Sequence, residues 1–119
     1  MANQEIPKLI IVSPCYNEEA ILRYSADTLT SFLKRVIALG KIAPSSRILY
    51  VNDGSRDRTW SLIEELHKDN SFVEGLSLAK NVGSELAVMA GMMARTINTR
   101  IRKEARTKTL ALSSAKSFL

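Results

Sequence analysis

Three short polar segments of this 119-residue chain contain the side chains best suited to chemistry. They read PCYNE at 14–18, NDGSRD at 52–57 and AKNVG at 79–83. An aromatic ring beside amide and carboxylate groups, as at Tyr16-Asn17-Glu18, can stack on a base and bond its edges. A carboxylate followed by glycine, as at Asp53-Gly54, can accept hydrogen bonds where the backbone approaches a ligand closely. These residue types favour a nucleoside ligand.

The first two segments also have a structural interpretation. Asn17 and Glu18 could cap the helix that follows them. Asp53-Gly54-Ser55 could be a tight turn before an N-cap at Asp57. The glycine patterns of dinucleotide-binding folds and of P-loops are absent from the chain. Residue types alone therefore leave both a turn and a binding site open.

Each polar segment follows an apolar run that has the pattern of a buried strand. The sequence predicts strands at 9–12, 48–51 and 72–78, and helices at 18–39, 57–68 and 84–95. Methionines 89, 92 and 93 fall on the apolar stripe of the last helix and are expected in the core. Strands that alternate with helices imply a parallel sheet covered on both faces, an α/β fold of Rossmann-like type. Ligands of such sheets bind beyond the carboxyl ends of the strands, where the polar segments should meet.

The composition is that of an ordinary globular protein, with 45% hydrophobic and 24% charged residues. A single cysteine cannot form a disulfide within the chain, so a cytoplasmic location is expected. Apolar stretches are too short for a transmembrane segment, and the first residues lack the pattern of a secretory signal. The chain is therefore expected to begin at or near Met1.

Charge is distributed unevenly along the chain. Residues 1–94 carry ten Lys and Arg against eleven Asp and Glu, whereas residues 95–119 carry seven Lys and Arg against Glu104 alone. The basic part contains neither glycine nor proline, and no strand is evident in it. We therefore expect one domain over 1–95 and a basic tail over 96–119 that lies outside the fold, which would leave an open sheet edge.

Together, the order and spacing of the three segments resemble the family 2 inverting glycosyltransferases of GT-A fold. The similarity runs from about residue 8 to residue 95 and includes PCYNEE at 14–19 and VNDGSRDRT at 51–59. The most similar branch comprises polyprenyl-phosphate sugar transferases, such as dolichol-phosphate mannosyltransferases and bactoprenol glucosyltransferases. The resemblance implies a UDP- or GDP-sugar donor at the strand ends and a lipid phosphate that attacks the sugar with inversion.

The resemblance also implies roles for individual residues in each segment. Pro14, Tyr16 and Glu18 would line the base and ribose pocket, in a loop shaped by Asn17. Asp53 would hydrogen-bond the base. The other implied positions serve the turn or the phosphates, with Gly54 and Ser55 supporting the turn, and Lys80 and Asn81 near the nucleotide and its phosphates.

The sequence departs from this family after the third segment. Family members hold Mg²⁺ or Mn²⁺ with an Asp-x-Asp motif after a fourth strand, but no aspartate follows Asp69 here. Ser84 stands where a His or Lys is usual. No catalytic residue or metal ligand is assigned, and the chain is expected to be the catalytically incompetent N-terminal part of a glycosyltransferase. An interrupted reading frame or a native short form would both explain this.

A second function class remains open for the basic residues of 95–119. They could bind nucleic acid or an anionic membrane surface through phosphate groups. A solvated tail without function is the simpler interpretation, and nucleic-acid binding is not the expected role.

Overall fold

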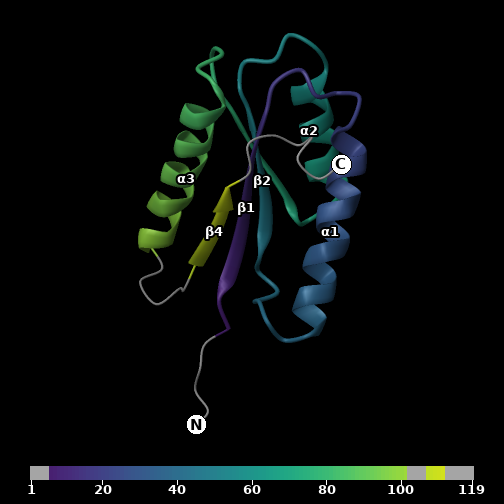
Figure 1. Ribbon diagram of the computed structural model, residues 1–119, viewed down its shortest axis with the longest axis vertical. Helices are drawn as coiled ribbons and strands as arrows, with labels where there is room; N and C mark the ends of the chain where they lie inside the picture. The colour runs from purple at the N-terminus through teal and green to yellow at the C-terminus, as the bar shows by residue number, and fades with distance from the viewer. Residues whose placement is uncertain (1–5, 102–106, 112–119) are drawn as a thin grey trace.

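The computed structural model describes residues 6–101 and 107–111 of the chain. Strands and helices alternate along the sequence in the predicted order (Figure 1). The elements are β1 (Lys8–Cys15), α1 (Leu22–Ala38), β2 (Arg47–Asn52), α2 (Thr59–Asp69), β3 (Val73–Ser77), α3 (Ser84–Ile101) and β4 (Thr107–Ala111).

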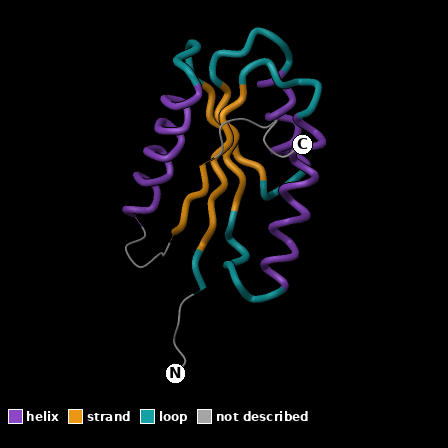
Figure 2. The backbone as a smooth tube through the Cα atoms, in the orientation of Figure 1, coloured by secondary structure: helices purple, strands orange, loops and turns teal. Residues whose placement is uncertain are grey.

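The strands form one parallel sheet in the order β3-β2-β1-β4. The β1–β2 register places Ile11 beside Ile48 and Cys15 beside Asn52, so the two strands end at the same level. Helices α1 and α2 cover one face of the sheet and α3 covers the other (Figure 2). The predicted α/β fold with helices on both faces is confirmed.

Successive residues of each strand pack into two apolar layers, as the period of a strand requires. On β1, Ile11 and Cys15 belong to the cluster under α1 and α2, whereas Ile10 and Val12 belong to the cluster under α3. These β1 residues are at most 1% exposed. Both faces of the sheet are therefore buried, which explains the continuous apolar runs in the sequence.

The expectation of a tail without a strand is wrong over residues 107–111. Helix α3 continues to Ile101 rather than ending at Arg95, and β4 pairs with β1 from Lys8 to Val12. Strand β1 would otherwise leave its backbone groups unpaired on this side, and threonines at alternate positions of TKTLA suit a strand. The sheet edge beside β1 is consequently occupied by β4.

Other predictions about the ends of the chain lie outside the described residues. These include the start at Met1 and the parts of the basic tail at 102–106 and 112–119. The side chains of residues 95–119 are also outside the description. The division of the chain at residue 95 therefore stays a prediction.

Helix α3 approaches the sheet through small residues rather than through its methionines. Met89, Met92 and Met93 are 54%, 39% and 62% exposed, so the expectation that they are core residues is wrong. Ala87 is fully buried, and a Cβ on Gly91 would lie 2.8 Å from Cγ2 of Val51. The glycine allows the helix backbone to pack directly on the sheet, which fixes the position of α3.

We expect Gly91→Ala to destabilise the chain. The added methyl group would overlap Val51 and Val12, at a cost of about 1–3 kcal/mol, against a gain of about 1 kcal/mol in helix propensity. Urea denaturation should show a lower free energy of unfolding than for the unmodified chain. Met89→Ala on the exposed side is the control, with a change within about 0.5 kcal/mol. A Gly91→Ala chain as stable as that control would contradict the close packing.

Candidate functional site

The three predicted polar segments lie together at one edge of the sheet. Each follows the carboxyl end of a parallel strand, and their loops form the upper end of the molecule in Figure 1. A cavity of about 240 Å³ opens among them. The lining residues come from all three loops and the start of α3: Pro14, Cys15, Tyr16, Glu18, Asp53, Asn81, Gly83 and Ser84.

Most side chains predicted to contact a nucleotide line this cavity, and the residues assigned to shape the loops lie beside it. The structure adds Cys15, Gly83 and Ser84 to the predicted set. Cys15 ends β1, and Ser84 begins α3 directly after the third segment. Cys15 and Gly83 lie within the predicted polar segments and Ser84 directly follows the third, so the sequence placed all three at this edge of the sheet. The remaining predicted residues, which are absent from the lining, are Asn17, Gly54, Ser55 and Lys80.

Asn17 joins the first loop to the second. Its backbone is in the left-handed region, with φ of 53°, which asparagine tolerates better than most residues. Its N–H donates to Oγ of Ser55 (2.9 Å), and its Oδ1 accepts from the N–H of Arg56 (2.9 Å). Asn17 and Ser55 thus hold the two loops in register.

A second set of hydrogen bonds connects the first loop, at Glu18, with the start of α2. The N–H of Glu18 donates to Oγ1 of Thr59 (2.8 Å), and Thr59 donates through its N–H and hydroxyl to Oδ1 of Asp57. Partial burial raises the pKa of Asp57, but hydrogen bonds from Thr59 and Glu19 outweigh it and hold that pKa below its usual value. The carboxylate also accepts the N–H of Thr59, the first residue of α2. The N-cap position itself is occupied by Arg58, which makes no side-chain capping bond, so the prediction that Asp57 is the N-cap residue is wrong.

The capping interpretation of Asn17 and Glu18 is wrong for α1. The helix begins at Leu22, not at Glu18, and its N-cap residue Ile21 makes no side-chain capping bond. The side chain of Asn17 instead binds the second loop. The polar residues of the first loop therefore serve the junction between loops and leave Glu18 on the cavity wall.

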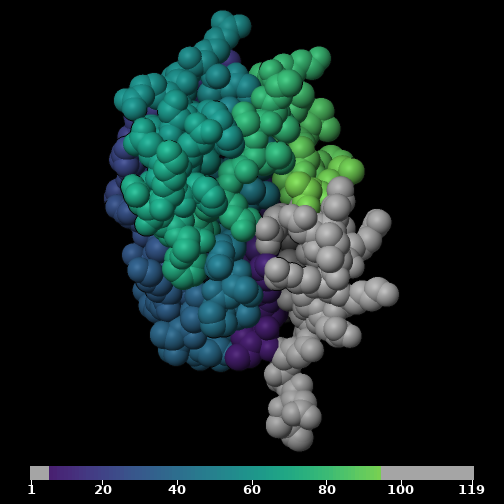
Figure 3. All heavy atoms as spheres, turned by 180° about the vertical axis from the view of Figure 1, so that it is seen from behind, coloured from purple at the N-terminus to yellow at the C-terminus, as the bar shows by residue number. Residues whose placement is uncertain are grey.

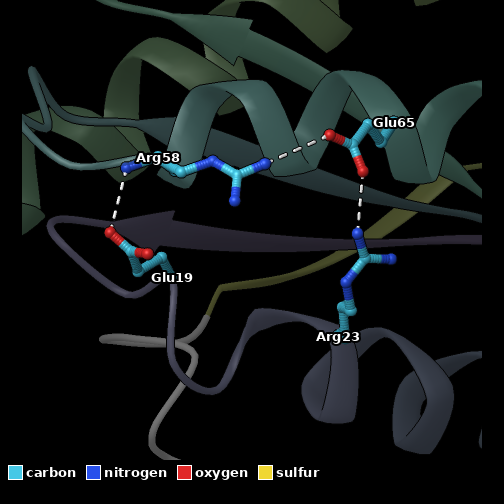
Figure 4. A network of polar contacts seen from close by, with 4 residues as sticks. All are labelled: Glu19, Arg23, Arg58 and Glu65. Carbon is cyan, nitrogen blue, oxygen red and sulfur yellow. Dashed lines mark hydrogen bonds and ion pairs between the residues drawn. The ribbon is translucent and has the colours of Figure 1, made fainter.

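Ion pairs brace the helices behind these loops (Figure 4). Glu65 on α2 pairs with Arg23 on α1 at 2.7 Å and with Arg58 at 3.6 Å, and the N–H of Arg58 donates to Oε1 of Glu19. Surface pairs of this kind stabilise by about 0–1 kcal/mol. They link the surfaces of α1 and α2 and add little to the stability of the fold.

The third loop is held by the carboxylate of Asp53, which is 2% exposed. The N–H groups of Val82 and Gly83 donate to its two oxygens at 2.8 and 3.0 Å. The amide of Asn81 donates to Oδ2 at 3.1 Å and to the backbone carbonyl of Asp53 at 3.0 Å. One buried side chain of the second loop thus organises the third.

Gly54 permits the same two loops to touch. Its φ is +69°, and a Cβ there would lie 2.3 Å from the backbone nitrogen of Asn81 and 2.6 Å from the carbonyl carbon of Lys80. No side chain fits between these backbones. Asp53 thus lines the cavity, while Gly54 allows the second loop to lie against the third. The interpretation of Asp-Gly-Ser as a binding site stays a prediction.

The described residues do not assemble a metal site. No group of three or more His, Cys, Asp or Glu side chains within 6–101 and 107–111 could hold an ion. The divalent cation implied by the family resemblance therefore has no fitting ligand set in this part of the chain.

A larger cavity, of about 610 Å³, lies elsewhere, at the open edge of β3 between α2 and α3. Trp60 and His67 of α2 and Ala94 of α3 are among its lining residues. In the view from behind, the teal residues that include α2 and the green residues of α3 flank this region (Figure 3). None of the predicted site residues lines it, so residue chemistry favours the smaller cavity as the functional site.

None of the helices in the described ranges has the length and hydropathy needed to span a bilayer. This applies to α3 as well, whose 18 residues have exposed methionines but also polar positions.

We expect Gly54→Ala to destabilise the chain more than Gly40→Ala. Both glycines have positive φ, 69° and 74°, but a Cβ on Gly40 meets nothing within 4 Å. The shared backbone strain should cost about 1–2 kcal/mol at each site, and the clash with the third loop should add about 1 kcal/mol or more at Gly54. Urea denaturation measures both. Equal losses would mean that the second and third loops are not in contact.

Cys15 should be unreactive in the folded chain. Burial, together with the nearby Glu18 carboxylate, raises the pKa of its thiol to about 12, despite a hydrogen bond to Ser13. Because the thiolate is the reactive species, alkylation by iodoacetamide at pH 8 should be slower than in the urea-unfolded chain by on the order of a thousandfold. Mass spectrometry over time measures both rates. Equal rates in the two states would show that Cys15 is not buried at the cavity.

Residues 10–96 match the model of glycosyl transferase family 2. An uncharacterized glycosyltransferase, YkoT of Bacillus subtilis, is 45% identical over 89 residues, which cover 75% of this chain and 26% of the relative. The bactoprenol glucosyl transferase of Shigella phage SfX is 34% identical over 71% of this chain and 26% of its own.

An undecaprenyl-phosphate 4-deoxy-4-formamido-L-arabinose transferase of Shewanella sediminis is 37% identical over 75% of this chain and 25% of its own. The chain thus spans about a quarter of the length of these relatives. The aligned part contains all three loops that form the cavity. The chain belongs to glycosyltransferase family 2.

Proposed function

We propose that the cavity binds the nucleoside part of a UDP- or GDP-sugar. The observation that carries this proposal is the convergence of three strand-end loops on one cavity that has an aromatic ring, Tyr16, at its mouth and the polar residues Glu18, Asp53 and Asn81 on its walls. Ligand cavities commonly measure about 300–1,000 Å³. A cavity of about 240 Å³ suits a base and part of a ribose rather than a complete sugar nucleotide.

Within this proposal, the residues divide into contacts and supports. Tyr16, 44% exposed, offers its ring for stacking, and Pro14 and Glu18 form the wall behind it. Lys80 is exposed on the third loop and supplies a positive charge for the phosphates. The supports are Asn17, Gly54 and Ser55, which hold the loops together without lining the cavity.

We further propose that the branch of the family to which this chain belongs transfers a sugar to a polyprenyl phosphate. Two relatives carry bactoprenol or undecaprenyl phosphate in their names. The described part of the chain contains no metal-holding cluster, and it spans only a quarter of those relatives. Nucleotide binding without turnover is therefore the function proposed for this chain, and a cytoplasmic location stays a prediction. Since residues 107–111 form a sheet strand, the basic segment is not proposed as a separate binding tail.

Isothermal titration calorimetry with UDP and with GDP tests the proposal. Tyr16→Ala should weaken binding of the preferred nucleotide by roughly five- to a hundredfold, the effect of losing one stacked base. Tyr24→Ala is the matched control, because Tyr24 is also exposed but lies on α1. The proposal fails if neither nucleotide binds, or if the two tyrosine variants lose affinity equally.

The charge of Lys80 can be tested in the same way. Lys80→Ala should weaken UDP more than uridine, since only UDP carries phosphates for the ammonium group to contact. Lys41→Ala, an exposed lysine that follows the carboxyl end of α1, should change neither affinity. An equal effect of Lys80→Ala on UDP and uridine would contradict a phosphate contact.

A further inference from the structure

We propose that β3 is a dimer interface, at which it pairs antiparallel with β3 of a second copy of this chain. The pairing joins two four-stranded sheets into one continuous sheet. This inference goes beyond the proposed function, because the interface lies beside the cavity of about 610 Å³ and not at the nucleotide cavity.

Strand β3 is the last strand on its side of the sheet within the described residues. Successive residues of such a strand direct their backbone groups to opposite sides. The carbonyl of Phe72 accepts from the N–H of Ile48, and the N–H of Leu78 donates to β2 in the same way. Even-numbered residues from 72 to 78 thus bond β2. Odd-numbered residues direct their N–H and C=O groups to the open edge.

The residues with outward backbone groups are Val73, Gly75 and Ser77. Those of Val73 are used within the chain, because its N–H donates to the carbonyl of Asn70 at 3.0 Å and its carbonyl accepts from Nδ1 of His67 at 2.7 Å. Among the described residues, no donor or acceptor reaches the outward groups of Gly75 and Ser77. Two N–H and two C=O groups are therefore left for a partner.

A second copy presents the same four groups in matching positions. A two-fold axis at Leu76 places Gly75 of each copy opposite Ser77 of the other, and each such antiparallel pair exchanges two hydrogen bonds. All four outward groups of each strand are then satisfied by the same surface on both copies, as an isologous interface requires. The two Leu76 residues lie directly opposite each other, where side chains approach most closely.

The surface around this edge also suits a copy of itself. Gly75 and Ser77 are small and exposed, so their side chains leave room for another backbone. The adjoining cavity has apolar walls that include Trp60, and the interfaces of homodimers are more apolar than other protein surfaces. Its charged residues, among them Glu64 and Lys68, carry both signs. A patch with both signs can pair with itself, whereas a patch of one sign would repel its copy.

Sedimentation velocity from micromolar to millimolar concentration should show a monomer–dimer equilibrium of the unmodified chain. Ser77→Pro removes the outward N–H but no bond to β2, and edge strands tolerate proline at such a position. By symmetry two hydrogen bonds are lost per dimer, so the dissociation constant should rise roughly ten- to a hundredfold. Ser77→Ala is the matched control and should dimerise normally, because it keeps the N–H and loses only the hydroxyl that accepts from Asn52.

Two results would overturn the proposal. One is a monomer at every concentration. The other is a dimer that Ser77→Pro leaves as tight as Ser77→Ala does, since the contact would then lie elsewhere, for example on the exposed methionines of α3. Circular dichroism shows whether Ser77→Pro is folded, and if it is not, hydrogen exchange of the unmodified chain decides.

Amide hydrogen exchange reads the pairing without any variant. The amides of Gly75 and Ser77 should be protected at high concentration and exchange faster on dilution, while the amide of Leu76, which faces β2, stays protected at both. A contact between helices would not produce this alternation along β3. Exchange of Gly75 and Ser77 that is independent of concentration would overturn the proposal. Both experiments omit nucleotide, so their outcome does not depend on the proposed function.

Discussion

The buried carboxylate of Asp53 is the constraint on which the arrangement of the site depends. It lies at the end of β2 with 2% exposure, so its negative charge must be satisfied by donors within the protein. The donors that reach it are two backbone N–H groups and one amide of the third loop. Such proximity requires that residue 54 have no side chain, because the third-loop backbone occupies its place. The buried charge of Asp53, the glycine at position 54 and the path of the third loop therefore depend on one another.

Equivalent constraints fix the first loop against the second. Asn17 takes a left-handed conformation and receives an N–H from the second loop, while Thr59 links Glu18 to Asp57. The parallel sheet makes these contacts possible, because it ends β1 and β2 at the same level. Behind the loops, α1 and α2 pack into one apolar cluster with the sheet. The segments that form the cavity walls are therefore fixed both by the strands that they follow and by hydrogen bonds between loops.

The sequence predicted the fold class and the meeting of the three polar segments at one edge of the sheet, because both follow from local patterns. Continuous apolar runs such as 48–51 indicate doubly buried strands, and polar segments after them mark the ligand edge. The role of Asn17 as a bridge and the donors to Asp53 were not predictable, because they depend on which loops meet in space. Strand β4 was missed because TKTLA gains its strand partner only when β1 is adjacent. The prediction for the methionines of α3 was wrong because an apolar stripe does not show which side of a helix faces the sheet. The side that faces the sheet here is the one with Gly91.

The central claim is that the three strand-end loops form one nucleotide site. Amide chemical shifts of the isotope-labelled chain, followed by NMR during titration with UDP or GDP, test it most directly. The account predicts that shifts concentrate at residues 14–18, 53–57 and 80–85, and that the residues around the larger cavity at β3, such as His67 and Lys68, stay unchanged. Shifts centred on that larger cavity, or no shifts at any nucleotide concentration that keeps the chain folded, would contradict it.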